Sequence, residues 1–201
     1  MSASTETRWW WVRHAPVPCP HGQIVGRLDL ACDTSDETDF QRLAARLPTQ
    51  AVVLESGLLR CRQTIGALEM AGLRVAPPII EPDLIEQDFG LWQGRAWPDI
   101  EAAEDAALPA FRADPAFQAP PGGESFARLV ERVGAAIARL TAAHAGRDII
   151  AVAHAGTIRA AIAVALGLPP DRALSLVVRP LSLTRLDAVF GDWRIDCVNC
   201  G

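Results

Sequence analysis

Two histidines and two arginines follow apolar runs of this sequence, and together these four side chains could bind and attack a phosphoryl group. Arg13 and His14 follow the first run, Arg60 lies shortly after the second, and His154 follows the third. The runs are Trp9–Val12, Ala51–Leu54 and Asp148–Ala153. Cationic groups that converge on one crevice repel one another unless an anion lies between them. The pattern therefore predicts an anionic ligand, and phosphate is the natural candidate.

The chemistry of these residue types suits phosphoryl transfer. Guanidinium groups hold phosphate oxygens through forked hydrogen bonds, and a helix beginning after His154 would add backbone N–H donors. An imidazole with one nitrogen held protonated can attack phosphorus through the other nitrogen. Glu86 lies in a proline-marked, turn-rich stretch, where a loop could bring a carboxylic acid over the phosphate as a proton donor. We therefore expect His14 to be the nucleophile of a phosphatase.

The elements that must position these groups alternate between strands and helices. The three apolar runs are typical of buried strands, and further strands are expected at Leu176–Val178, Leu181–Leu186 and Trp193–Val198. Helical spacing predicts a helix capped by Thr34 and Glu37, one ending near Gly72, one from Ser125 to about Gly146, and one from about Thr157 to Leu166. The order predicts an α/β fold, a three-layer α/β/α sandwich with a mostly parallel central sheet. Ligands in such sheets bind beyond the carboxyl ends of the strands.

Residues 95–120 interrupt this alternation. They are rich in alanine, proline and acidic residues, with weak periodicity, which favours a lid-like insertion in a single domain spanning residues 1–201. Trp92 and Trp97 flank this segment, where they could pack it down or line a substrate pocket.

Five sequence motifs in order resemble those of the histidine phosphatases, the phosphoglycerate mutase-like superfamily, over about three quarters of the chain. They are Arg13-His14, SGLLRCRQT at 56–64, EQDFGLWQG at 86–94, PGGES at 121–125 and VAHAGTIR at 152–159. Such an ordered set is hard to obtain by chance. The short length and the last two motifs look most like the α-ribazole phosphatase and broad-specificity phosphatase branches.

The resemblance implies a role for each matching residue. His14 would be the nucleophile, and Glu86 would protonate the leaving group and later activate water. The implied phosphoryl-binding groups are Arg13, Arg60, His154 and the amide of Ala155, with Thr64 and Ser125 as supporting residues. No cofactor or metal is implied.

The loop after His14 departs from the family pattern. The family usually has glycine, then a Glu-Thr or Glu-Ser pair, and an asparagine six residues after the histidine. Here Ala15, Pro16, Val17 and Pro20 stand at those places. We expect His21 and Arg27, in the same loop, to be candidates for the missing polar contacts.

Several functions remain open at this stage. Hydrolysis of a small phosphorylated metabolite is favoured over phosphoglycerate mutase activity, because the insertion offers only Arg95 and Arg112 to hold a second phosphate. The substrate could be α-ribazole 5′-phosphate, an intermediate of cobalamin synthesis. A non-catalytic phospho-ligand binding protein would keep the pocket and lose turnover. A metal-dependent hydrolase lacks an HxH or HExxH ligand set.

Composition excludes other classes of function. The formal net charge of −5 and the lack of a basic run argue against a nucleic-acid surface, and no apolar run is long enough to span a membrane. The five cysteines fit a reducing compartment, and Cys197 and Cys200 are expected to be ordinary thiols. We expect a cytoplasmic protein whose partner is a small phosphorylated metabolite, with a homodimer as a candidate assembly.

Overall fold

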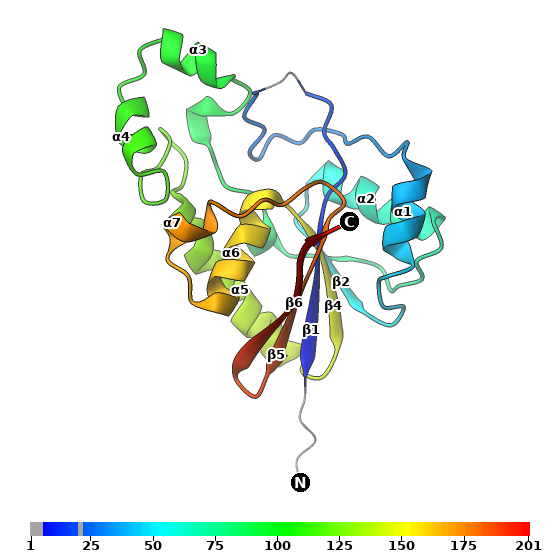
Figure 1. Cartoon of the computed structure of the whole chain (residues 1–201). Helices are drawn as coiled ribbons and strands as arrows, with labels where there is room; N and C mark the ends of the chain where they lie inside the picture. The colour runs from blue at the N-terminus through cyan, green and yellow to red at the C-terminus, as the bar shows by residue number, and fades with distance from the viewer. Residues whose placement is uncertain (1–5, 20–21) are drawn as a thin grey trace.

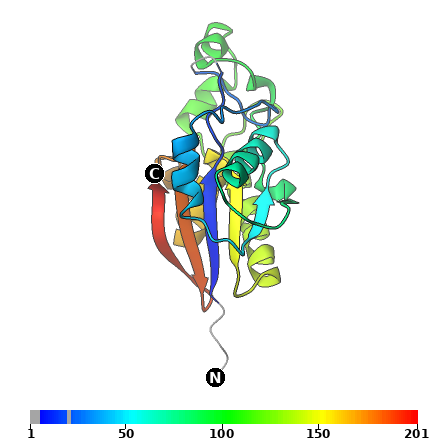
Figure 2. The ribbon, with the colours of Figure 1, turned by 90° about the vertical axis from the view of Figure 1, so that its right-hand side faces the viewer.

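A six-stranded mixed sheet forms the centre of the computed structural model, which describes residues 6–19 and 22–201. The strands lie in the order β3-β2-β4-β1-β5-β6, as seen across the sheet in Figure 2. Their bounds are β1 Thr7–Arg13, β2 Val52–Glu55, β3 Ile79–Ile80, β4 Asp148–Ala153, β5 Leu183–Val189 and β6 Asp192–Cys200. The first four strands in this order are parallel, whereas β5 and β6 are antiparallel to their neighbours. The expectation of a mostly parallel sheet is confirmed.

Helices cover both faces of this sheet (Figure 1). On one face lie α1 (Glu37–Ala44) and α2 (Leu59–Met70), and on the other lie α5 (Phe126–Ala143), α6 (Ala155–Leu166) and the short α7 (Pro170–Ala173). The expected three-layer sandwich is therefore correct. Among the helices described, none combines the length and the apolar character that a bilayer span requires.

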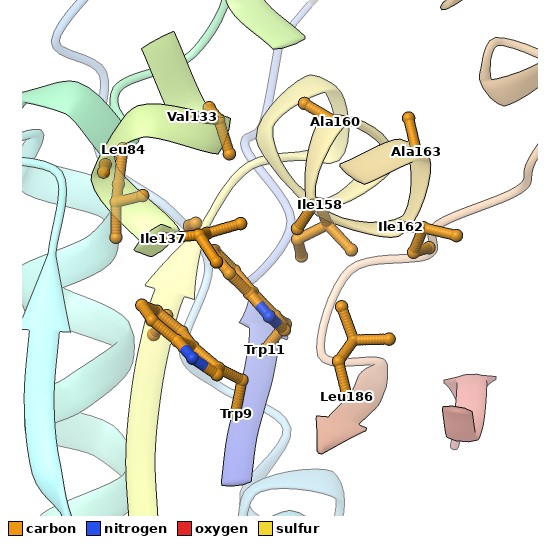
Figure 3. Packing of buried hydrophobic residues seen from close by; sticks show 14 of the residues in the cluster. Trp9, Trp11, Leu84, Val133, Ile137, Ile158, Ala160, Ile162, Ala163 and Leu186 are labelled. Carbon is orange, nitrogen blue, oxygen red and sulfur yellow. The ribbon is translucent and has the colours of Figure 1, made fainter. Parts of the chain in front are cut away.

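Strand β1 is anchored by its tryptophans. Because side chains alternate along a strand, Trp9 and Trp11 share one face and pack beneath α5 and α6 (Figure 3). Both rings are completely buried and stack with centroids 5.0 Å apart. Val12 packs in the core cluster on the opposite face. Replacing either buried ring with alanine would cost about 3–5 kcal/mol of stability, so these rings fix the strand that ends at His14.

The inserted segment forms two short helices with a small core of its own. Helices α3 (Trp97–Ala102) and α4 (Leu108–Ala113) lie beyond the carboxyl ends of the parallel strands (Figure 1). Trp92, in the short 3-10 turn Gly90–Trp92, is fully buried there, with ring centroids 5.8 Å from Trp97 and 5.0 Å from Phe111. Both tryptophans thus pack the insertion down. A second 3-10 turn, Pro82–Leu84, precedes the Glu86 loop.

Some expected elements are placed differently. The N-cap of α1 is Asp36, whose carboxylate accepts from the backbone N–H of Asp39, so the expected Thr34–Glu37 capping box is wrong. Helix α6 begins at Ala155, two residues earlier than expected. The expected strand Leu176–Val178 is also wrong. The carbonyls of Leu176 and Val178 accept hydrogen bonds from arginine side chains instead of from a neighbouring strand.

Ser125 is the N-cap of α5, and its hydroxyl accepts from the backbone N–H of Arg128 at 3.3 Å. We predict that Ser125→Ala lowers the free energy of unfolding by about 1 kcal/mol, whereas Ser125→Gly lowers it by only a few tenths, because glycine is tolerated at an N-cap. Urea denaturation measures both. Equal losses in the two variants would contradict the prediction that the side chain at the N-cap sets the stability of α5.

Candidate active site

The pairing of β1 with β4 brings the two expected histidines together. Arg13 lies opposite Ala153 in the parallel register, and the backbone N–H of His14 donates to the carbonyl of Ala153 at 3.0 Å. Consequently the rings of His14 and His154 lie with centroids 5.1 Å apart. His14 lines a pocket of about 290 Å³ together with Arg13, Arg60 and Glu86.

The ring of His14 is held in one orientation by its own loop. Its Nδ1 lies 2.7 Å from the carbonyl oxygen of Ala15, so Nδ1 carries the proton and Nε2 keeps its lone pair when the ring is neutral. The backbone N–H of Ala15 donates to the Thr64 hydroxyl at 2.9 Å, and that hydroxyl donates to the carbonyl of Arg60 at 2.7 Å. Thr64 therefore fixes the backbone that aligns the histidine.

The environment of His14 favours the neutral ring. Burial, together with the nearby positive charges of Arg60 and Arg13, lowers the pKa of His14 to about 3, and the bond to the Ala15 carbonyl opposes this shift. A neutral imidazole at ordinary pH is the form that can act as a nucleophile.

His154 is completely buried, and both of its ring nitrogens contact protein atoms. Its Nδ1 accepts from Arg60 Nε at 3.2 Å, and its Nε2 lies 2.8 Å from the Ser56 hydroxyl. Burial and the charge of Arg60 lower the pKa of His154 well below its ordinary value. In this arrangement His154 orients Arg60. A direct bond to a phosphoryl oxygen would require Nδ1 to release Arg60 and gain a proton.

Arg60 links the site to the loop that contains Gly26 and Leu28. Its Nη1 donates to the carbonyl of Leu28 at 2.6 Å and its Nη2 to that of Gly26 at 2.7 Å. Gly26 has φ +51°, and a Cβ atom there would displace the Gln93 side chain, so both the backbone conformation and the close approach favour glycine. Each terminal nitrogen keeps a second N–H, which a ligand oxygen could accept.

Arg13 and Arg159 form the other cationic side of the site. Arg13 Nη1 donates to the carbonyl of Val178 at 2.6 Å, while its buried Nε has no partner among the described residues. Arg159 Nε donates to the carbonyl of Leu176 at 2.7 Å. Burial lowers the pKa of both guanidinium groups, and the charge of Glu86 opposes that shift. The unpaired Nε of Arg13 is a donor suited to an anion.

Glu86 faces this cationic side and is fixed by backbone donors. Its Oε2 accepts from the N–H of Gly156 at 3.2 Å, and its Oε1 accepts from the N–H of Gln87 at 2.9 Å. A Cβ atom on Gly156 would collide with Oε1, so a side chain at this position would displace the Glu86 carboxylate. Ala155 is the first residue of α6, where its amide lies at the positive end of the helix.

A charge network centred on Glu124 holds the Glu86 loop. Its carboxylate accepts from Arg27 at 2.8 Å and from Arg132 at 2.6 Å. Both arginines also donate to the carbonyl of Glu86, at 2.9 and 3.1 Å. Glu124 Oε1 further accepts from the backbone N–H of Asp88 at 3.1 Å. Because these groups are largely buried, the network fixes the loop more firmly than a surface ion pair would.

The structure brings together most of the expected site residues, with three exceptions. Ser125 caps α5 and does not line the pocket. Arg27 pairs with Asp88 and Glu124 and does not line the pocket, so it supports the Glu86 loop in this structure. His21 lies outside the described residues.

No group of three or more His, Cys, Asp or Glu side chains in residues 6–19 and 22–201 is arranged to hold a metal ion. Cys197 and Cys200 are free thiols on β6, and burial together with the neighbouring Cys200 raises the pKa of Cys197 to about 11.

A sequence model of the histidine phosphatase superfamily (branch 1) matches residues 9–201. The chain belongs to this superfamily. Three residues of the site lie in the motifs that resemble this superfamily. They are His14 after β1, Arg60 in α2 and His154 after β4.

Individual relatives in this superfamily are named as phosphatases. The metal-independent phosphoserine phosphatase of Arabidopsis thaliana is 32% identical over 144 residues, which cover 69% of this chain and 60% of that protein. The adenosylcobalamin/alpha-ribazole phosphatase of Escherichia coli is 32% identical over 120 residues, which cover 60% of this chain and 58% of that protein. The chain thus spans about 60% of the length of these curated relatives.

A solved structure extends the similarity to nearly the whole chain. The mycobacterial glucosyl-3-phosphoglycerate phosphatase superposes with a TM-score of 0.82 and 28% identity, covering 98% of this chain and 100% of that one.

Sequence reasoning missed four residues of this histidine phosphatase site. They are Ser56, Glu124, Arg132 and Arg159. Ser56 and Glu124 lie inside recognised motifs, so the motifs could have indicated them. Arg159 also ends a motif, but only the fold shows its charge facing Arg13 and Glu86. Arg132, in the middle of α5, carries no such signal.

The two buried histidines predict a loss of stability in acid. Their folded-state pKa values lie below the unfolded value of about 6.5, so the unfolded chain binds more protons between about pH 6.5 and the folded pKa, which is about 3 for His14. Stability should therefore fall as the pH is lowered through this window, by on the order of 1–2 kcal/mol per histidine between pH 7 and 5. Urea denaturation of the wild type and His14→Gln tests this prediction. The variant should show a shallower decline, and an identical decline would contradict the assignment.

Proposed function

We propose that this chain hydrolyses a small phosphomonoester through a phosphohistidine on His14. The observation that carries the proposal is the neutral, buried ring whose Nδ1 is fixed by the Ala15 carbonyl, beside Arg13 and Arg60. Membership in the histidine phosphatase superfamily and relatives named as phosphatases support it. The charges of the arginines match those of a phosphoryl group.

The first proposed step transfers the phosphoryl group to the enzyme. The Nε2 lone pair of His14 attacks phosphorus, and the bond between phosphorus and the leaving oxygen breaks. Protonated Glu86 gives its proton to that oxygen, so the leaving group departs as an alcohol. The imidazole becomes a phosphohistidine that retains its Nδ1 proton on the Ala15 carbonyl. Arg13 and Arg60 stabilise the charge on the phosphoryl oxygens.

The second step releases phosphate. Glu86, now a carboxylate, removes a proton from a water molecule whose oxygen attacks phosphorus. The N–P bond breaks, its electron pair returns to His14 Nε2, and inorganic phosphate leaves. Both steps use the same carboxyl group, so its fixed position on the N–H groups of Gln87 and Gly156 serves both.

The pocket rim favours hydrolysis of an ester with an uncharged leaving group. Apart from Arg13, His14, Arg60 and Glu86, the described lining residues are neutral: Pro16, Val17, Cys19, Gln23, Val25, Gly26 and Pro180. The arginines of the insertion bond within it, since Arg112 pairs with Glu101 and Arg95 donates to the carbonyl of Asp99. Neither lines the catalytic pocket, so neither is placed to retain a second phosphate there, which disfavours mutase activity. A panel with α-ribazole phosphate, phosphoserine and sugar phosphates would select the substrate.

The proposed nucleophile predicts a covalent intermediate. Brief reaction with a ³²P-labelled aryl phosphate, followed by alkaline quenching, should leave acid-labile label on the wild type and none on His14→Ala. Turnover by His14→Ala should fall at least about 10³-fold, because the nucleophile is removed. Labelling of that variant at the wild-type level would sink the mechanism. Phosphate binding without any turnover by the wild type would instead indicate a non-catalytic binding protein.

The proposed acid predicts a dependence on the leaving group. Glu86→Gln should reduce kcat/KM, which reports the first step alone, strongly for an alkyl phosphate and much less for p-nitrophenyl phosphate, whose leaving group needs little protonation. Gly156→Ala should act in the same direction, since the new methyl group displaces the Glu86 carboxylate. Gly66→Ala, in α2 with open space around its added Cβ, is the matched control and should leave kcat/KM unchanged. Equal losses for both substrates would argue against an acid role for Glu86.

A further inference from the structure

A second hollow of about 270 Å³ lies next to the catalytic pocket, between α1 and the loop that precedes β5. Its wall includes Arg42, Arg46, Arg179, Ser182 and Asn199. Pro180 lines both this hollow and the catalytic pocket, so the two are neighbours separated by one short loop. We refer to it as the arginine pocket.

The charged groups of the arginine pocket are mainly cationic. Its three arginines face one acidic side chain, Asp39, so cationic side chains outnumber acidic ones. Arg42 pairs with Asp39 at 2.8 Å, and Arg46 Nη1 donates to the carbonyl of Gly201 at 2.7 Å. The guanidinium group of Arg179 makes no hydrogen bond or ion pair with any described residue. At least one whole guanidinium fork is therefore open to an anion.

Neutral donors in the same wall also lack acceptors. Ser182 is only 3% exposed, and its hydroxyl has no hydrogen-bond partner in the described part of the chain. A buried hydroxyl that loses its bonds to water normally has a hydrogen-bond partner in the protein or in a ligand. The side-chain oxygen of Asn199 accepts from the backbone N–H of Arg179 at 2.6 Å, which leaves its NH₂ group as a donor.

The backbone around these donors is held in an uncommon conformation. Leu181 has φ +56° and Asn199 has φ +55°, and both line the pocket. Leucine at positive φ is rare and strained, so the rest of the fold must hold it there. Hydrogen bonds of the Leu181 N–H and the Ser182 carbonyl to the backbone of Arg13 keep the loop in place.

We infer that the arginine pocket is a second oxyanion site, which binds a phosphate ion or the phosphate group of a small ester. The excess of guanidinium groups over acidic side chains favours an anion. The guanidinium fork of Arg179, the Ser182 hydroxyl and the Asn199 amide supply donors of the kind that phosphate oxygens accept. This site is separate from the phosphoryl-transfer pocket and does not depend on turnover there.

The test follows inorganic phosphate binding at each site separately. In ¹⁵N–¹H spectra of the full chain at constant ionic strength, the amides of Leu181, Ser182 and Asn199 report the arginine pocket, and those of Ala155 and Gly156 report the catalytic pocket. Titration with phosphate should shift the first group saturably. Titration with chloride should not. A linear response that chloride reproduces would mean that only general screening occurs, and the inference would be wrong.

Two variants decide which side chains are responsible. Arg46→Ala/Arg179→Ala should weaken phosphate binding at the arginine pocket at least about tenfold, while the Ala155 and Gly156 amides still respond as in the wild type. Arg128→Ala, which removes a charge from the exposed face of α5, should change neither response. Unaltered binding at Leu181 and Ser182 in the double variant would refute the site, even if the catalytic pocket behaves as proposed.

A second ligand identifies the source of the phosphate group. Glucose 6-phosphate and inorganic phosphate are each titrated into His14→Ala, which lacks the proposed nucleophile and so does not hydrolyse the ester, with the same amides as reporters. Tighter binding than inorganic phosphate at the arginine pocket would assign the site to an ester, and tighter binding of inorganic phosphate would assign it to the free ion. Failure of both ligands to saturate the site would overturn the inference.

Discussion

The parallel pairing of β1 with β4 is the interaction on which the site depends. It sets Arg13 beside Ala153. Each of these residues is followed by a histidine, so the rings of His14 and His154 lie close together. A slip of one residue would turn each β1 side chain to the opposite face of the sheet. Trp9 and Trp11 oppose such a slip, because it would move both rings out of the hydrophobic core beneath α5 and α6 and onto the other face of the sheet. The hydrophobic packing of one strand therefore fixes the geometry of groups several residues away.

Burial affects the charge of the arginines and the charge of the histidines in the site differently. Arg13 and Arg60 stay ionised because the ordinary pKa of a guanidinium is so high that partial burial does not discharge it. The histidines start from a much lower pKa, so the same burial and the same arginines keep them neutral. The result is a nucleophile with a free lone pair beside fixed cations. An incoming dianion would reverse part of this balance, since it favours protonation of any imidazole that it contacts.

The sequence predicts the parts of the fold that follow from local periodicity and from buried strands. The β1, β2 and β4 strands and the residues at their carboxyl ends could be found because apolar runs end abruptly at polar groups. The conformation of Leu176–Val178 could not be assigned from its apolar residues, since its carbonyls accept hydrogen bonds from Arg159 and Arg13 in distant parts of the chain. The contacts of Arg27 could not be read from the sequence for the same reason. It lies in the loop after His14, and three acceptors on other loops bind its side chain.

The start of α6 shows how one backbone feature can support both partners of the proposed reaction. Helix N-termini carry a partial positive charge and unpaired N–H groups, which suit both carboxylates and phosphates. Here Gly156 donates to Glu86, while Ala155 begins the helix beside His154. Because Glu86 occupies only one of these donors, the carboxyl group can remain fixed while a phosphoryl oxygen approaches the other. Glycine at position 156 makes this arrangement possible, since any side chain would occupy the space of the carboxylate itself. The position of the acid thus depends on the absence of a single methyl group in a helix formed by another part of the chain.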